Sequence, residues 1–161
     1  MGKILLIEDK GSVAKEVIEK LQKESDFYIN ENDIIDCYDS DSAIGAWGRY
    51  KGEVDCIILD LNIDSEGLKD ELGEGVVGKY GMVPGILLLK IFEKDKGREK
   101  ICEMTIIHSA YLDDLKKTPI MKEAFYDKLP PPISKQRGIS IFKVVDAVRV
   151  ILKKKGVRYG R

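Results

Sequence analysis

Short apolar runs alternate with amphipathic stretches along this sequence. Residues 3–7, 34–38, 54–59, 102–107 and 124–127 have the apolar, partly β-branched character of strands that are buried on both faces. Apolar residues recur at helical spacing over residues 13–24, 43–47, 86–92 and 140–152, and more weakly over residues 111–123. This alternation predicts an α/β fold, with a parallel sheet covered by helices on both sides.

One segment interrupts the alternation. Residues 64–83 are rich in glycine and acidic residues and have no sustained apolar period. Pro84 can then occupy the first position of the next helix, where its missing N–H has no consequence. We therefore expect a single domain over residues 1–161, in which residues 64–83 form an inserted loop between the third strand and the third helix. A lid, a partner surface and a tolerated loop all remain open as its role.

Composition narrows the function classes. The 161 residues are 43% hydrophobic and 34% charged, which is ordinary for a globular protein, and the net charge of −1 argues against nucleic acid as a partner. The longest apolar runs are much shorter than the roughly 20 residues of a membrane helix, and no signal-peptide pattern precedes the first strand, so we expect a cytoplasmic protein. The three separate cysteines predict neither disulfides nor zinc, and the single histidine, His108, is interpreted as structural.

The predicted strands end in chemically active side chains. Glu8 and Asp9 follow the first strand, Asp60 the third, Ser109 the fourth and Lys128 the fifth. Parallel strands bring these ends to one edge of the sheet, where ligands of open α/β sheets bind. Clustered carboxylates repel one another and need protons or a cation, and Mg²⁺ suits such oxygen ligands. The pattern indicates phosphoryl transfer with Asp60 as the nucleophile.

The motifs at residues 4–9, 57–62, 106–110 and 125–128 resemble those of the response-regulator receiver domain of two-component signalling. The resemblance spans nearly the whole chain. It implies a flavodoxin-like (βα)5 fold, a doubly wound parallel five-stranded sheet with strand order 2-1-3-4-5, and here an insertion after strand 3. It also implies that the protein is a phosphoacceptor and not an enzyme, that a histidine kinase or histidine phosphotransfer protein is its donor, and that it signals by binding a downstream protein.

The same resemblance implies a role for each site residue. Asp60 would be the phosphoacceptor. Mg²⁺ would be held by Glu8, Asp9, Asp60 and the backbone carbonyl of Asn62. Ser109 and Lys128 would contact the phosphoryl group, and Phe125 would be the switch aromatic.

Two departures from the family pattern bear on these roles. The helix-starting Pro84 and Gly85 come some twenty residues later than the family places them. The family lysine is followed directly by proline, whereas Lys128 is followed by Leu129, so Lys135 is a rival for this position.

Three alternatives remain. The chain could be a receiver-like interaction module that acts without phosphorylation. It could be an aspartyl-nucleophile phosphatase, although Asn62 stands where such enzymes need an acid. Residues 60–71 also look like a calcium loop, but Ser65 occupies the position that requires glycine.

Overall fold

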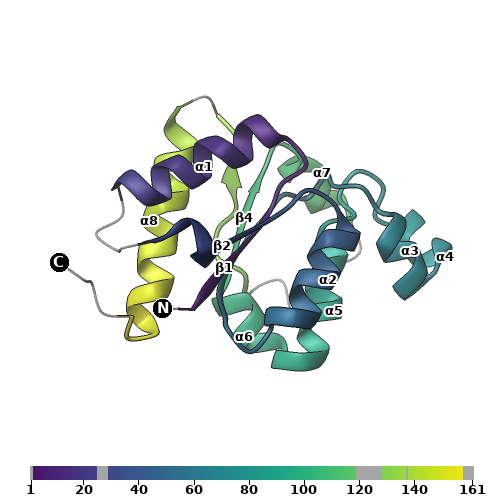
Figure 1. Ribbon diagram of the computed structural model, residues 1–161. Helices are drawn as coiled ribbons and strands as arrows, with labels where there is room; N and C mark the ends of the chain where they lie inside the picture. Colours follow the sequence, from purple (N-terminus) through teal and green to yellow (C-terminus); the bar gives the residue numbers. More distant parts are fainter. Residues whose placement is uncertain (1, 25–28, 119–127, 137, 158–161) are drawn as a thin grey trace.

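Five parallel strands form one sheet in the order β2-β1-β3-β4-β5 (Figure 1). The structure is a computed structural model that describes residues 2–24, 29–118, 128–136 and 138–157. The strands are β1 (Lys3–Ile7), β2 (Ile34–Cys37), β3 (Val54–Leu59), β4 (Thr105–Ser109) and β5 (Ile133–Ser134). The predicted fold class and strand order are confirmed.

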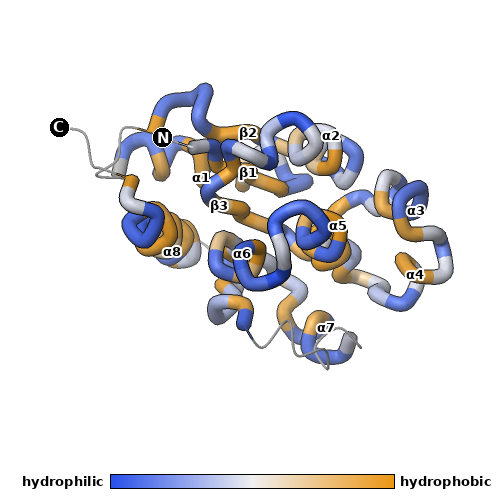
Figure 2. Tube along the Cα trace, turned by 90° about the horizontal axis from the view of Figure 1, so that it is seen from below, coloured by the Kyte–Doolittle hydropathy of each residue, from blue (hydrophilic) through white to orange (hydrophobic). Residues whose placement is uncertain are grey.

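Helices cover both faces of the sheet (Figures 1 and 2). On one face lie α1 (Gly11–Glu24) and α8 (Ile139–Lys154), and on the other lie α2 (Ser40–Tyr50) and α5 (Ile86–Lys96). The shorter α6 (Arg98–Glu103) and α7 (Leu112–Lys117) flank β4 in the sequence, and a 3₁₀ turn, η1 (Glu31–Asp33), precedes β2. None of the helices in the described ranges is long and apolar enough to cross a membrane.

The strands are apolar at nearly every position because both of their faces are buried. In β1, Ile4 and Leu6 pack toward α1 and α8, while Leu5 and Ile7 pack toward α2 and α5. This follows from the two-residue period of a strand, in which successive side chains point to opposite faces. The result is two separate apolar layers with the sheet between them.

The segment 64–83, predicted to be a loop, instead contains two short helices, α3 (Glu66–Leu72) and α4 (Glu74–Gly78). Each helix buries an apolar side chain, Leu68 in α3 and Val77 in α4. Gly67 packs so closely on α2 that an added Cβ would lie 2.3 Å from an Asp41 carboxylate oxygen. Helices of one or two turns are too short to display an apolar period, so the sequence pattern did not reveal them.

One strand boundary also differs from the sequence pattern, and one expected strand lies outside the described residues. Cys102, expected in the fourth strand, lies in α6, and β4 begins at Thr105. The fifth strand was expected at residues 124–127, which lie outside the described residues. The described β5 pairs Ile133 and Ser134 with His108 and Ser109 of β4. This short strand sets which lysine reaches the edge of the sheet.

Candidate functional site

Asp60 lies at the carboxyl end of β3, in the middle of the sheet edge. Its backbone N–H donates to the carbonyl of Ile7 at 2.8 Å, which continues the pairing between β1 and β3 by one more residue. The side chain is only 3% exposed. Because β1, β3, β4 and β5 are parallel neighbours, the residues that follow them converge on this carboxylate.

Both oxygens of Asp60 accept strong hydrogen bonds. Ser109 Oγ donates to Oδ1 at 2.7 Å, and Lys135 Nζ donates to Oδ2 at 2.7 Å. The backbone N–H of Asn62 also donates to Oδ1, at 3.3 Å, which ties the following turn to the carboxylate. The side chain is thereby fixed in one orientation, with a hydroxyl and an ammonium group beside it.

Lys135 also pairs with Glu8. Its ammonium lies 2.7 Å from Glu8 Oε2, so one cation bridges two buried carboxylates. Burial by itself lowers the pKa of the Lys135 ammonium, but its hydrogen bonds to Asp60 and Glu8 outweigh burial and raise that pKa above its usual value. Lys135 therefore stays charged at neutral pH.

Glu8 is a carboxyl group whose protonation state changes near neutral pH. Burial raises the pKa of this carboxyl group to about 7, although its contacts with Lys135 pull the pKa in the opposite direction. Its Oε1 also accepts a hydrogen bond from the backbone N–H of Lys10 at 3.1 Å. Near neutral pH Glu8 can thus carry either a proton or a negative charge.

Three carboxylates at this edge could hold a metal ion. One oxygen each of Glu8, Asp9 and Asp60 lies within 4.8 Å of the others, and Asp9 is exposed. A set made only of carboxylate oxygens suits a hard cation such as Mg²⁺ or Mn²⁺. The exposed side of the cluster leaves room for the waters that Mg²⁺ retains.

The structure places Lys135, and not Lys128, beside Asp60. Lys128 Nζ instead pairs with Glu99 at 2.7 Å, and both of these side chains are more than half exposed. Assigning Lys128 to the site therefore does not match the geometry, whereas the rival, Lys135, does. Phe125, the predicted switch aromatic, lies outside the described residues.

The position of Lys135 follows from β5. This strand has only two residues, and directly after it the N–H of Lys135 donates to the carbonyl of Ser109 at 3.2 Å. A two-residue strand next to a proline run leaves almost no pattern in a sequence. The one available signal was that Ile133 and Lys135 are the first apolar and cationic residues after those prolines.

Gly85 has a role at the site that sequence reasoning missed. Its N–H donates to the carbonyl of Leu61 at 2.7 Å, and a Cβ at this position would lie 2.4 Å from the carbonyl oxygen of Asp60. Only glycine allows the start of α5 to approach the end of β3 so closely. The backbone on both sides of Asp60 is therefore held in place.

Comparisons with solved structures agree with this fold. A response regulator receiver domain protein from Clostridium thermocellum is 16% identical over 98% of each chain, with a TM-score of 0.57. The Mn²⁺-bound form of the response regulator Rcp1 is 15% identical over 100% of this chain and 98% of that chain, with a TM-score of 0.56. No family model matches the sequence, and no curated protein matches it either.

The fold alone does not fix the function. A de novo designed Rossmann 2x3 fold protein is 21% identical over 100% of this chain and 96% of its own, with a TM-score of 0.53. The chain has the fold of response-regulator receiver domains, and that fold also exists in a designed protein. What the protein does must therefore be argued from the residues around Asp60.

Proposed function

We propose that this protein is a receiver that accepts a phosphoryl group on Asp60 with the help of Mg²⁺, and that it signals by binding a partner protein. The observation that carries this proposal is the set of contacts to one carboxylate. A hydroxyl and an ammonium each lie 2.7 Å from Asp60, and two further carboxylates lie within reach of a shared cation. These are the groups that phosphoryl transfer to a carboxylate requires.

In the proposed reaction a carboxylate oxygen of Asp60 forms a bond to phosphorus as the bond from phosphorus to the leaving group breaks. The leaving group departs with the electron pair, and Asp60 becomes an acyl phosphate. Lys135 and Ser109 then exchange their hydrogen bonds to the carboxylate for hydrogen bonds to phosphoryl oxygens. Mg²⁺ held by Glu8, Asp9, Asp60 and the carbonyl of Asn62 would neutralise charge on those oxygens.

The switch would follow from this exchange of partners. Ser109 is the last residue of β4 and Lys135 directly follows β5, so movement of either side chain reaches the neighbouring loop and helix. A change from 1:99 to 99:1 between two states needs about 5.5 kcal/mol of differential stabilisation, which charge-assisted hydrogen bonds to a phosphoryl group can supply. The proposed donor is a histidine kinase or a histidine phosphotransfer protein, and turnover of a substrate is not part of the function.

Intact-mass measurement tests the proposal. The protein is incubated with acetyl phosphate and Mg²⁺, and a gain of one phosphate is expected. Asp60→Asn should abolish the gain, whereas Asp64→Asn, which changes an exposed acid on the same loop, should keep it. Labelling of the Asp60→Asn variant would contradict the assignment of Asp60.

One observation favours a second candidate, an interaction module that acts without phosphorylation. The ammonium of Lys135 already bridges Glu8 and Asp60, so one of their two negative charges is compensated without a metal ion. If the wild-type protein gains no phosphate from acetyl phosphate, while a partner still binds it, this candidate replaces the first.

A further inference from the structure

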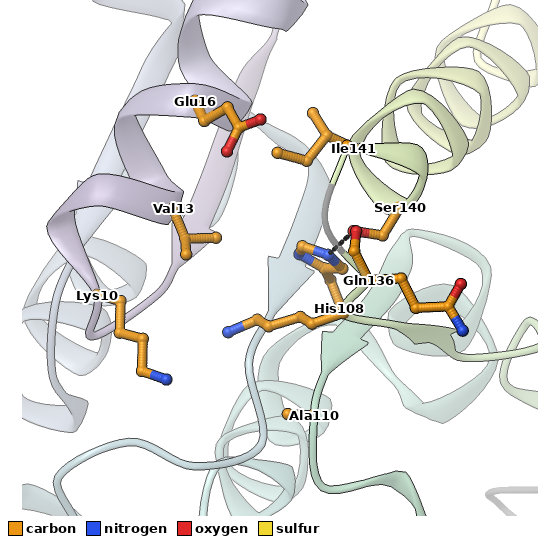
Figure 3. Close-up of a pocket in the computed structure, with 10 residues that line it drawn as sticks. Lys10, Val13, Glu16, His108, Ala110, Gln136, Ser140 and Ile141 are labelled. Atoms are coloured by element: carbon orange, nitrogen blue, oxygen red, sulfur yellow. Dashed lines mark hydrogen bonds between the residues drawn. The ribbon is translucent and has the colours of Figure 1, made fainter.

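A pocket of about 260 Å³ lies between the start of α1 and the start of α8, next to the site but distinct from the carboxylate cluster. Its walls include the apolar side chains Val13, Ala110 and Ile141, and His108 lines it from the end of β4 (Figure 3). None of the three carboxylates described above lines this pocket. Lys135 lines the pocket and also pairs with Asp60, and Lys10 lines it while its backbone N–H donates to Glu8.

His108 offers the pocket an unpaired acceptor. Ser140 Oγ donates its single hydrogen to the carbonyl of Gln136 at 2.9 Å, so in the 3.1 Å contact between Ser140 Oγ and His108 Nε2 the histidine must be the donor (Figure 3). The neutral ring then leaves Nδ1 as an acceptor, and Nδ1 has no partner among the described residues.

The ring stays neutral at physiological pH. His108 is only 2% exposed, and burial lowers its pKa to about 4, with the nearby charge of Lys135 acting in the same direction. Nδ1 is not among the buried polar atoms that lack a partner, so it is open to the pocket, where water or a ligand can donate a hydrogen bond to it.

The charged side chains around the pocket already have counter-charges nearby. Lys135 is ion-paired with Glu8 and Asp60, and the two other charged side chains in the lining, Lys10 and Glu16, have opposite signs. The lining therefore presents no cluster of like charges that would select an anion or a cation. The apolar walls, in turn, give water few hydrogen-bond partners.

We propose that this pocket binds a small uncharged molecule that has an apolar body of about the size of a benzene ring and one O–H or N–H group, which donates a hydrogen bond to His108 Nδ1. The size fits, since an apolar cavity of about 150 Å³ already holds benzene. The apolar body lies between Val13 and Ile141. The bound molecule touches Lys135, so it lies within reach of the chemistry at Asp60 without occupying that site.

The test uses phenol as the probe and fluorobenzene as its matched control, because the two have nearly the same shape and only phenol can donate a hydrogen bond. Both are titrated into the full chain, labelled at the methyl groups of valine and isoleucine, and followed by NMR. Phenol should shift the methyl signals of Val13 and Ile141 saturably, with a dissociation constant on the order of 1 mM. It should bind at least as tightly as fluorobenzene, although fluorobenzene is the more hydrophobic compound.

Two variants identify the contacts. His108→Phe keeps a ring but removes the acceptor, so phenol should lose roughly fivefold in affinity relative to fluorobenzene, the ratio for a hydrogen bond of about 1 kcal/mol. Val13→Phe fills the pocket from a half-buried position and should abolish binding of both probes. Val150→Phe, at an exposed position of α8, is the control and should bind both as the wild type does.

Several results would overturn the proposal. One is an equal loss of affinity for both probes in His108→Phe, which would mean that the hydrogen bond is absent. Another is the lack of a saturable shift at Val13 and Ile141 with millimolar phenol. A third is full retention of binding in a folded Val13→Phe variant. None of these results depends on whether Asp60 accepts phosphate.

Discussion

Replacing Lys135 by methionine should make the stability of the protein fall with rising pH. In the wild type the Lys135 ammonium lies 2.7 Å from Glu8 Oε2 and 2.7 Å from Asp60 Oδ2, and both carboxyl side chains are 3% exposed. Methionine keeps most of the side-chain volume but not the charge. The two buried carboxylates then face one another without a cation, so Glu8 must keep a proton in the folded state.

The magnitude follows from proton linkage. In the wild type Glu8 ionises at a pKa of about 7, so well above pH 7 the folded and unfolded states bind equal numbers of protons at this residue. Without Lys135 the folded state loses roughly 6 kcal/mol of attraction at 2.7 Å with an effective dielectric of about 20, which raises the Glu8 pKa far above its wild-type value. Between pH 7 and pH 9 the unfolded state is already ionised. The variant therefore loses about 1.4 kcal/mol per pH unit relative to the wild type.

Urea unfolding at pH 7, 8 and 9 measures this effect. Trp47 is the single tryptophan, and it is buried against Phe92 with a distance of 4.2 Å between ring centroids, so its fluorescence reports unfolding of the core. The difference in unfolding free energy between wild type and Lys135→Met should grow by about 2.3 kcal/mol from pH 7 to pH 9, because the wild type itself loses about 0.4 kcal/mol as its half-protonated Glu8 ionises. Lys128→Met is the matched control, and it should show a small difference that does not change with pH because this lysine is exposed.

A constant difference between pH 7 and pH 9 would mean that Lys135 does not hold Glu8 ionised. If the unfolding free energy of Lys128→Met fell with rising pH instead, Lys128 and not Lys135 would be the cation beside Glu8 and Asp60. Adding Mg²⁺ provides a second check. Because the metal would bind the same carboxylates only in the folded state, it should stabilise Lys135→Met more than the wild type.

Three other measurements test separate features of the structure. The pKa of His108 is lowered to about 4 in the folded state, against 6.5 in the unfolded state. The neutral ring therefore contributes to the stability of the fold above pH 6.5, and this contribution is lost as the pH falls toward 4. In urea titrations over this range, the wild type should lose about 3 kcal/mol more stability than His108→Gln. Gly85→Ala places a Cβ 2.4 Å from the Asp60 carbonyl oxygen and should lower the melting temperature clearly, whereas Gly45→Ala in α2, which meets nothing within 4 Å, should leave it equal or higher. Asp9→Ala should weaken Mg²⁺ binding in calorimetry while leaving the melting temperature nearly unchanged, because Asp9 is exposed; an unchanged affinity would remove Asp9 from the metal site.

The sequence was sufficient to predict the position of a site residue where a clear apolar strand precedes that residue. Four consecutive apolar residues precede both Glu8 and Asp60, and two apolar residues and His108 precede Ser109. Their parallel pairing follows from the alternation with helices, so the meeting of these three residues at one edge could be expected. The structure brings Asp60 and Ser109 within 2.7 Å of one another.

The sequence was insufficient to predict the elements whose position depends on tertiary contacts, namely β5, α3 and α4. Residues 124–127 look more like a strand than Ile133 and Ser134, yet the described pairing with β4 is made by these last two. The choice between Lys128 and Lys135 depends on that pairing. The helices α3 and α4 were missed for a similar reason, since single buried residues such as Leu68 hold them against the domain.

The hydrogen bond between Gly85 N and Leu61 O, at 2.7 Å, closes the segment 62–84 at its base. The chain leaves the sheet at Leu61 and returns to the same point before α5 begins. Asn62 stays tied to Asp60 through its N–H, whereas we expect that residues 64–82 can be shortened, lengthened or replaced by another small domain without changing the path of the chain on either side. A version with residues 64–82 exchanged for a short glycine linker would cost the burial of Leu68, Val77 and Tyr80 but would leave β3 and α5 joined as they are. The segment is thus a place where a new recognition element can be introduced next to an unaltered Asp60.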